Sequence, residues 1–459
     1  MQASCASAAV FALRSGRGTA KLTGMSASAP QRDHRTVGRW LVLAAYAVLV
    51  AIRAPAIVWP GRFWGEEATI YFREAFLRSP WEVLLSPDLG YYSLFNKLAT
   101  LAAARGVPLE WAPLVTIGFA LGIQVVPAVL LLFARFPAWP AWRQRAAGVA
   151  LILLVQPNQE VWLNTINSQY FLCLATGLVL ISTPPADRRA HGARLGLLVL
   201  AGLTGIVSAL WWPLFLLEHR RTRHPRRLHE LMALGAAAAL QAVVVLAGSG
   251  RAVQPVWSLL PLALAGKQWV LPLFGHRAFD GFIDFLRAWP SLTCFPGSLA
   301  LFLPYVAVAG GVWRQRNWTA GLLLAAAVGI AVVSLAFSLP AQRLESFGYS
   351  CITATADGRY YYAPNALLAL ALLALVAAPG STAGRPAAAI RVGSGLLLSF
   401  LLATGAANFR HYGGWSHGPS WPAEVRAWRA GQIDTLAVWP APWRLDLRRN
   451  PPDPETRRP

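Results

Sequence analysis

Charged residues are scarce in this chain. Only 13% of its 459 residues are Asp, Glu, Lys or Arg, whereas 56% are hydrophobic; soluble proteins average about 25% charged residues. Apolar runs long enough to cross roughly 30 Å of hydrocarbon recur between Arg39 and Ala407. This composition excludes an ordinary soluble domain and predicts an all-α polytopic membrane protein.

Cysteines and phosphate-binding motifs are also few. The four cysteines, Cys5, Cys173, Cys294 and Cys351, have no metal-ligand spacing. Cys294 and Cys351 both fall in segments expected on the outer side of the membrane, so one disulfide between them stays open. No glycine-rich phosphate loop is present. We therefore expect no nucleotide and no cofactor, with a divalent metal ion left open.

Basic residues are plentiful, and their positions are informative. A net charge of +21 would by itself suggest a nucleic-acid partner. The arginines instead gather in short gaps between apolar runs, as expected of cytoplasmic loops under the positive-inside rule. We therefore predict no nucleic-acid partner. The gaps contain Arg135, Arg143 and Arg145; Arg188, Arg189 and Arg194; Arg220, Arg221, Arg223, Arg226 and Arg227; Arg314 and Arg316; and Arg385 and Arg391.

The charge pattern fits best with eleven crossings, a cytoplasmic N-terminus and an extracytoplasmic C-terminus. They are expected at about residues 40–59, 110–134, 146–157, 161–182, 193–205, 206–218, 229–248, 293–313, 318–338, 363–379 and 388–405.

Three regions follow from this topology. Residues 1–36 lack the layout of a signal peptide and are expected to be disordered and cytoplasmic, with translation starting at Met1 or Met25. Residues 37–405 form the transmembrane domain, whose first outer loop covers residues 59–109. The third region is the extracytoplasmic tail, residues 406–459.

That outer loop and the tail have expected elements of their own. Surface helices are predicted at Glu67–Arg78 and Tyr91–Ala104 in the loop. The extracytoplasmic tail, residues 406–459, is expected to pack as a small cap, with an amphipathic stretch at Trp421–Gly431 and a strand at Leu436–Trp439.

Two adjacent acids, Glu66 and Glu67, follow the first expected crossing. Charge is costly near the bilayer core, so this pair is a candidate for chemistry. A carboxylate here can take the proton of an acceptor hydroxyl that attacks the anomeric carbon of a sugar. In a partly dry cleft, one of two adjacent acids has a raised pKa. The alternative is an exposed helix N-terminus, where the helix dipole favours acids.

Arg359 and the tyrosines that follow it stand at the outer end of a late crossing. A guanidinium there can hold a lipid-linked phosphate through two hydrogen bonds. The tyrosines, Tyr360, Tyr361 and Tyr362, can line a sugar or acceptor site. The alternative is an aromatic belt with an arginine that extends to the interface.

Other polar residues on the expected outer side are further candidates for substrate binding. The amides among them can hydrogen-bond a sugar or tie helices together, and the structural role is favoured. No group of residues has the spacing of a metal site. The candidates are Tyr91, Lys97, Asn164, Asn167 and Gln169.

The layout resembles bacterial membrane proteins of the GT-C glycosyltransferase superfamily. The shared features are one helix, a large outer loop that opens with an acidic pair, a surface helix and many spans with short loops. The resemblance covers most of residues 40–410, and its motifs are short. They are Trp64-Gly65-Glu66-Glu67-Ala68, Gly90-Tyr91-Tyr92-Ser93-Leu94 and Arg359-Tyr360-Tyr361-Tyr362-Ala363-Pro364.

The resemblance implies a GT-C-like fold in the bacterial inner membrane and a polyprenyl-phosphate-linked sugar donor. The acceptor would be an extracytoplasmic glycan, lipid or protein. Carried over, Glu66 or Glu67 is the base and Arg359 binds the donor phosphate. The chain departs from the commoner Asp-Glu pair by having Glu-Glu, which leaves open a member without transferase activity.

Two other functions stay open at this point. One is a non-enzymatic transporter or flippase of lipid-linked glycans, and the other is a surface-glycan polymerase. A transporter is expected to have paired intramembrane charges and broken helices in two matching halves. The sequence shows neither pattern.

Overall fold

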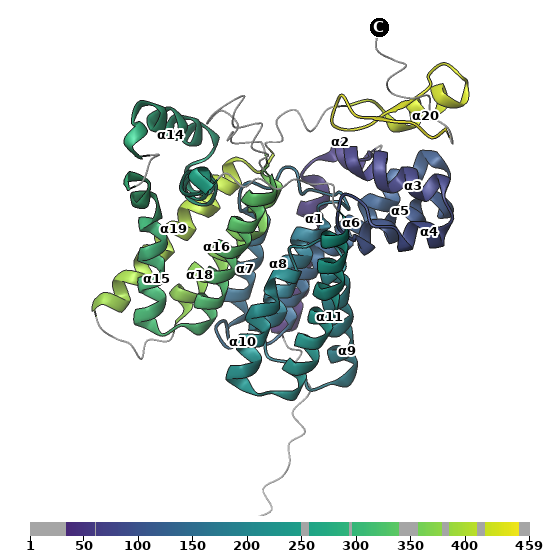
Figure 1. Cartoon of the computed structure of the whole chain (residues 1–459). Coiled ribbons are helices and arrows are strands. Elements are labelled where there is room, and N and C mark those ends of the chain that lie inside the picture. Colours follow the sequence, from purple (N-terminus) through teal and green to yellow (C-terminus); the bar gives the residue numbers. More distant parts are fainter. Residues whose placement is uncertain are drawn as a thin grey trace, which may run out of the picture.

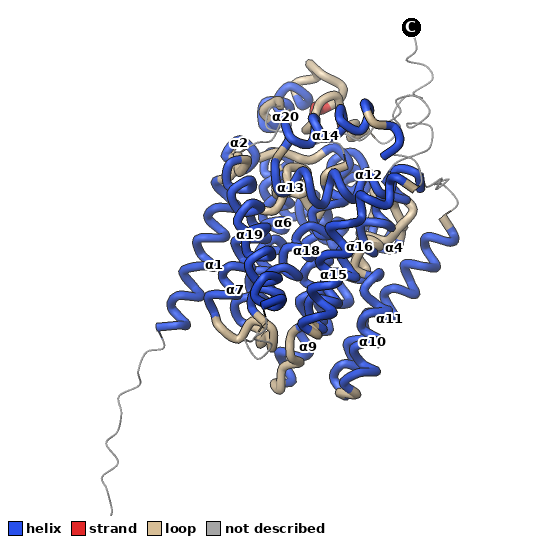
Figure 2. Tube along the Cα trace, turned by 90° about the vertical axis from the view of Figure 1, so that its left-hand side faces the viewer, coloured by secondary structure: helices blue, strands red, loops and turns tan. Residues whose placement is uncertain are grey.

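The computed structural model describes residues 34–59, 61–248, 257–292, 296–338, 357–378, 385–410 and 418–448. Over these residues the chain is helical almost throughout, and its regular strands are limited to one short hairpin (Figure 2). The prediction of an all-α protein is therefore confirmed for this part of the chain. Cys294, Cys351 and residues 1–33 of the expected N-terminal segment lie outside the described residues, and α1 begins at His34.

The longer helices run side by side between two ends of the molecule, and most of the short elements gather at one end (Figure 1). The helices of this bundle are α1 (His34–Ile52), α6 (Ala112–Phe133), α7 (Trp142–Leu154), α8 (Ser168–Ile181), α9 (Arg188–Gly202), α10 (Trp212–Thr222), α11 (Pro225–Ala247), α15 (Leu303–Gln315), α16 (Trp318–Ser338), α18 (Arg359–Ala377) and α19 (Arg385–Ala407).

The other α-helices are α2 (Pro55–Val58), α3 (Arg73–Leu77), α4 (Pro80–Leu85), α5 (Leu94–Gly106), α12 (Leu260–Leu264), α13 (Leu271–Phe274), α14 (His276–Ala288) and α20 (Trp421–Arg429). Segments of π-helix are η1 (Glu67–Phe72) and η5 (Ala265–Val270). Segments of 3-10 helix are η2 (Leu109–Trp111), η3 (Ala209–Trp211), η4 (Trp257–Leu259), η6 (Pro290–Leu292) and η7 (Gly297–Phe302). Strands β1 (Leu436–Ala437) and β2 (Arg444–Leu445) pair antiparallel.

Six described helical segments are long and apolar enough to cross a membrane. The chain therefore has the character of a membrane-spanning protein, but the expected number of eleven crossings is not confirmed. Apolar helices at Thr36–Ile52 and Ser168–Ile181 are shorter. The six segments are Leu109–Phe133, Pro225–Ala247, Gly297–Gln315, Trp318–Leu335, Arg359–Ala377 and Arg385–Ala407.

The expected crossing at residues 161–182 begins later in the structure. Helix α8 starts only at Ser168, and residues 155–167 form an irregular segment. The side-chain amides of Asn164 and Asn167 both donate to the carbonyl oxygen of Glu160, at 2.7 and 2.8 Å. Such local bonds compete with helical backbone bonds, so this segment turns at the end of the bundle instead of extending the helix.

Helix α18 is the centre of the bundle. In its apolar stretch of 18 residues, 83% of the residues are buried inside the protein, and the helix packs against α7, α8, α16 and α19. Its sequence is rich in Ala and Leu on all sides, as expected of a helix surrounded by others. Tyr362 donates to the carbonyl oxygen of Ile152 at 2.8 Å, and Asn365 donates to those of Gln156 and Lys267 at 2.7 and 2.8 Å. These bonds fix the start of α18, where Arg359 lies.

The arginine-rich connections meet at one end of the bundle. Backbone N–H of Thr183 donates to the carbonyl oxygen of Arg135 at 2.8 Å, which joins the α6–α7 and α8–α9 connections. The Arg226 guanidinium donates to the carbonyl oxygen of Ala186 at 2.6 Å, which joins the α8–α9 connection to the start of α11. Figure 1 shows α9 and α10 at this end and α14 and α20 at the other.

The first long connection folds as a compact group of helices. Helices η1 and α3 cover the expected helix at Glu67–Arg78, and α5 covers most of the one at Tyr91–Ala104. Helix α4 between them was not predicted. It begins with a capping box, in which Ser79 and Glu82 bond to each other's backbone N–H.

The tail packs against this group of helices. Trp421 of α20 is buried with Phe63 and Phe72 in a separate apolar cluster, and its indole N–H donates to the carbonyl oxygen of Leu109 at 2.8 Å. The backbone N–H of Trp439 donates to the carbonyl oxygen of Phe63 at 3.2 Å. The tail is thereby attached directly beside the segment that carries Glu66 and Glu67.

Candidate functional site

A cavity of about 130 Å³ lies at the end of the bundle that carries the first long connection. Glu66 and Arg359 face each other in it, with 3.7 Å between a carboxylate oxygen and a guanidinium nitrogen. Their side chains are 20% and 25% exposed. A carboxylate from the first connection and a guanidinium from the start of α18 therefore meet at a site that solutes can reach.

Glu67 occupies a different environment from its neighbour. Its side chain is 1% exposed and lies outside the cavity lining. One carboxylate oxygen accepts from the backbone N–H and the hydroxyl of Thr165, at 2.8 and 2.5 Å, and the other accepts from the backbone N–H of Trp64 at 3.1 Å. Successive residues of a helix point about 100° apart, so only one of the two acids faces the cavity.

Burial raises the pKa of the Glu67 carboxyl above its ordinary value. The hydrogen bonds from Thr165 and Trp64 and the charge of Arg62 act in the opposite direction. The bonds tie the start of η1 to the irregular segment before α8. Glu67 thus holds the backbone on which Glu66 is carried.

Arg359 is positioned by contacts on several sides. Its guanidinium lies 5.2 Å from the ring centroid of Tyr360, within the range of a cation–π contact. Its backbone N–H donates to a carboxylate oxygen of Glu160 at 3.0 Å. Tyr360 packs edge-on against Tyr170 of α8, with 6.1 Å between ring centroids. These contacts hold the start of α18 against the end of the bundle.

Sequence reasoning missed a second group of charges behind Arg359. Glu160 and Lys267 are both buried. Burial raises the pKa of Glu160, and the charge of Arg359 opposes this rise. Burial also lowers the pKa of Lys267 to about 8, and the charges of Asp357 and Glu160 oppose this fall. The available signal was the polar run from Gln156 to Glu160 between two apolar runs.

The remaining predicted binding residues divide into two sets. The cavity is lined by Tyr91, Asn167, Gln169 and Tyr360. Lys97, Asn164 and Tyr361 do not line it.

The side chains of the second set are buried, and each is paired with another residue or packed in the apolar core. Lys97 is paired with Asp88. The Asn164 side chain accepts from the backbone N–H of Asn167 at 3.0 Å, and Tyr361 is buried in the main apolar core.

One side of the cavity is apolar and comes from helices that can span a membrane. Val245 belongs to α11 and Val333 to α16, and Ile206 and Val207, from the connection after α9, also line the cavity. A polar end with one ion pair and an apolar wall therefore share one space. This arrangement suits a ligand with a charged group and a hydrocarbon chain.

The described residues contain no group of three or more His, Cys, Asp or Glu side chains placed to hold a metal ion. Glu66 and Glu160 approach the ends of Arg359 separately, one through the guanidinium and the other through the backbone N–H.

No protein-family model, curated protein or solved structure matches this chain. What the fold itself defines is an α-helical protein with helices fit to cross a membrane and a charged cavity at one end of the bundle.

Proposed function

We propose that this protein is a membrane glycosyltransferase of the GT-C kind, which transfers a sugar from a polyprenyl-phosphate-linked donor to an acceptor hydroxyl. The observation that carries the proposal is the Glu66–Arg359 pair in a cavity with an apolar wall. The reaction needs a base for the acceptor, a cation for the leaving phosphate and a path for the lipid. The cavity has one candidate for each.

In the proposed reaction, the acceptor oxygen attacks the anomeric carbon and its proton moves to the Glu66 carboxylate. The bond between the anomeric carbon and the phosphate oxygen breaks, and its electron pair leaves with the phosphate. Arg359 stabilises the negative charge of that phosphate through charge-assisted hydrogen bonds. Because the bond to phosphate already activates the donor sugar, the reaction needs no nucleotide.

Glu66 is the proposed base because of its position. Its side chain lines the cavity, while Glu67 is enclosed and accepts three hydrogen bonds. An enclosed carboxylate that does not line the cavity cannot reach a solute bound there. Glu67 is therefore assigned a positioning role.

The apolar wall is the proposed path of the polyprenyl chain. Val245 and Val333 lie on segments that can span a membrane, so a lipid chain beside them stays in contact with hydrocarbon. In this proposal the cavity opens on the extracytoplasmic side of the bacterial inner membrane, and the arginine-rich end is cytoplasmic, following the positive-inside rule.

The test is sugar transfer from polyprenyl-phosphate sugars by the full chain in lipid, with soluble and lipid acceptors. Glu66→Gln is expected to lower turnover by roughly 10²-fold or more. Glu82→Gln is the matched control, since glutamine preserves the capping box of α4 and Glu82 lies outside the cavity. Control activity should equal wild type.

Equal turnover of Glu66→Gln and wild type would refute the assignment of the base. If no donor supports transfer but labelled lipid-linked glycan crosses the bilayer, the protein is a flippase. Extension of lipid-linked glycans by whole repeat units would instead identify a polymerase.

A further inference from the structure

A second cavity, of about 520 Å³, lies at the opposite, arginine-rich end of the bundle. The ends of α8, α10, α11 and α18 meet here with the turn between α15 and α16. Its ionisable lining residues are Glu218, Arg221, His224, Arg227 and Arg316. This site shares no lining residue with the Glu66 cavity.

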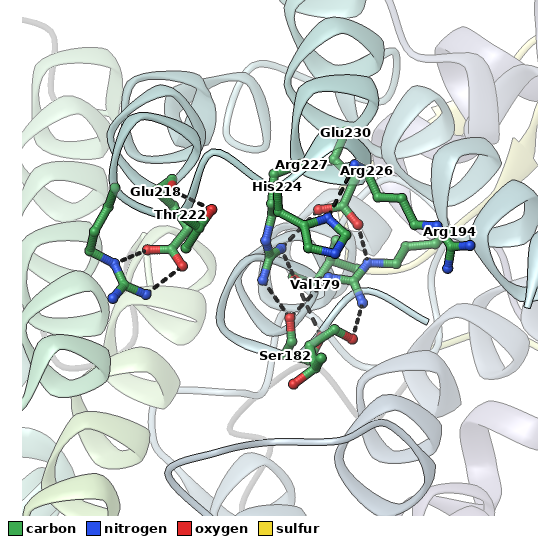
Figure 3. Close-up of polar contacts among 11 residues, drawn as sticks. Val179, Ser182, Arg194, Glu218, Thr222, His224, Arg226, Arg227 and Glu230 are labelled. Carbon is green, nitrogen blue, oxygen red and sulfur yellow. Dashed lines mark hydrogen bonds and ion pairs between the residues drawn. The ribbon is translucent and has the colours of Figure 1, made fainter. Parts of the chain in front are cut away.

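Two buried arginines share a single acid beside the cavity, and one of them, Arg227, lines it. Arg194 and Arg227 contact opposite oxygens of Glu230, at 2.7 and 2.8 Å (Figure 3). Arg227 also donates to the carbonyl oxygen of Ser182 at 2.5 Å. One carboxylate cannot balance two guanidinium groups, so this cluster leaves a positive charge at the cavity wall.

The acid within the cavity is already neutralised. Glu218 accepts two hydrogen bonds from Arg221, at 2.9 and 2.8 Å, and a third from the indole N–H of Trp318 at 2.8 Å. Its negative charge therefore does little to reduce the positive potential from Arg227 and Arg316. The cavity as a whole favours an anion.

Two polar groups at the turn between α15 and α16 are available to that anion. Arg316 is exposed, and its guanidinium has no hydrogen bond or ion pair within the described residues. The side-chain amide of Gln315 is buried, and neither its nitrogen nor its oxygen has a partner within the described structure. Both residues line the cavity. An unpaired buried amide costs free energy, and a bound ligand would remove that cost.

An apolar groove of about 700 Å³ adjoins the cavity. The cavity and the groove share Arg316, Asn317, Trp318 and Leu322 in their linings. The groove continues along exposed surface, and its other lining residues are Leu214, Leu217, Val312, Trp313, Gly321 and Ala325.

The turn lies where two candidate spans meet. One ends at Gln315 and the next begins at Trp318. Trp313 is 84% exposed, and tryptophan at a helix end is typical of the membrane–water interface. The cavity therefore lies at headgroup depth, and the groove runs from it toward hydrocarbon.

We propose that the cavity and groove together bind a membrane glycerophospholipid with an anionic phosphate headgroup. The phosphate lies near Arg316 and Gln315, with the Arg194–Arg227–Glu230 cluster supplying positive potential, and an acyl chain lies in the groove. Basic pockets between transmembrane helices bind anionic headgroups in this way. The groove favours a lipid over a free anion, because a free anion would leave it uncovered.

The experiment measures lipid binding by native mass spectrometry of the delipidated full chain. Phosphatidylglycerol is the probe, diacylglycerol is the lipid without a phosphate group, and inorganic phosphate is the competitor. Arg316→Gln removes a contact in the cavity, and Ala325→Trp fills the groove. Arg314→Gln is the matched control, because it removes the same charge from an exposed residue of α15 that lines neither space.

We expect Arg316→Gln to weaken phosphatidylglycerol binding roughly tenfold, as for loss of one charged hydrogen bond. Ala325→Trp should weaken it as well, and Arg314→Gln should leave it within twofold. Inorganic phosphate should not displace the lipid.

Three results would overturn the proposal. Equal effects of Arg314→Gln and Arg316→Gln would show diffuse surface charge instead of a site. Equal binding of the two lipids would show a groove without headgroup recognition. Full displacement by inorganic phosphate, with no effect of Ala325→Trp, would show a site for a free anion.

Discussion

The adjacent carboxylates Glu66 and Glu67 should respond in opposite ways to the same substitution. Glu66 is one-fifth exposed and makes one ion pair at 3.7 Å, which contributes less than about 1 kcal/mol to stability. Glu67 is enclosed and accepts three hydrogen bonds. Changing Glu to Gln keeps the size of the side chain, so the two variants differ only in what each carboxylate contacts.

The expected loss at Glu67 follows from its bonds. In Glu67→Gln the amide oxygen can still accept from Thr165, but the amide NH₂ then faces the backbone N–H of Trp64. A buried unpaired donor costs about 2 kcal/mol. Glu67→Leu leaves all three donors unpaired and should cost about 4 kcal/mol or more.

The assay is thermal unfolding of the purified chain in one detergent at one scan rate, because irreversible unfolding makes the midpoint depend on the rate. At about 2 °C per kcal/mol, Glu67→Gln should lower Tm by about 4 °C and Glu67→Leu by about 8 °C. Glu66→Gln should stay within about 2 °C of wild type while losing transfer activity. A Tm loss in Glu66→Gln as large as in Glu67→Gln would refute the separation of roles.

Further predictions concern the donor phosphate, a buried lysine and the tail. Arg359→Lys should raise the KM for the lipid-linked donor about tenfold, because lysine keeps the charge but cannot make the bidentate hydrogen bonds of a guanidinium. Arg359→Gln should raise the KM further, and steady-state kinetics equal to those of wild type would exclude this role. The pKa of Lys267 falls to about 8 in the folded chain, so its contribution to stability is present above pH 10.5 and is lost as pH falls through 8. As the pH falls from 10.5 to 8, the Tm of wild type should therefore drop relative to the Tm of Lys267→Met, and a constant difference would contradict this prediction. Trp421→Ala, which empties a buried site, should cost about 3–5 kcal/mol and expose the tail to protease, whereas Trp81→Ala, 73% exposed, should change neither.

The sequence predicted the class of the protein because that class depends on composition. Apolar runs and arginine-rich gaps are local properties, and they indicated helices able to cross a membrane and connections that gather at one end. Element ends were less predictable where polar side chains compete with the backbone. The late start of α8 depends on Asn164 and Asn167, whose bonds to Glu160 appear only in the folded segment.

The candidate site was predictable only in part. The motif at Glu66 and Glu67 and the late Arg359 were recognisable as polar groups in an apolar chain. Nothing local distinguishes the two acids, since both are glutamates at the start of one helix. The buried acid Glu160 was not recognised because it adjoins an apolar run and its partner is far along the chain.

Composition alone thus determined that the chain is a helical membrane-spanning protein, because the cost of charge in hydrocarbon acts on every residue separately. The tertiary structure decided that Glu66 faces Arg359 while Glu67 binds Thr165. These contacts depend on how α18 packs within the bundle and where the segment before α8 turns. Such long-range packing is a property of the whole fold, and no local pattern of residues encodes it.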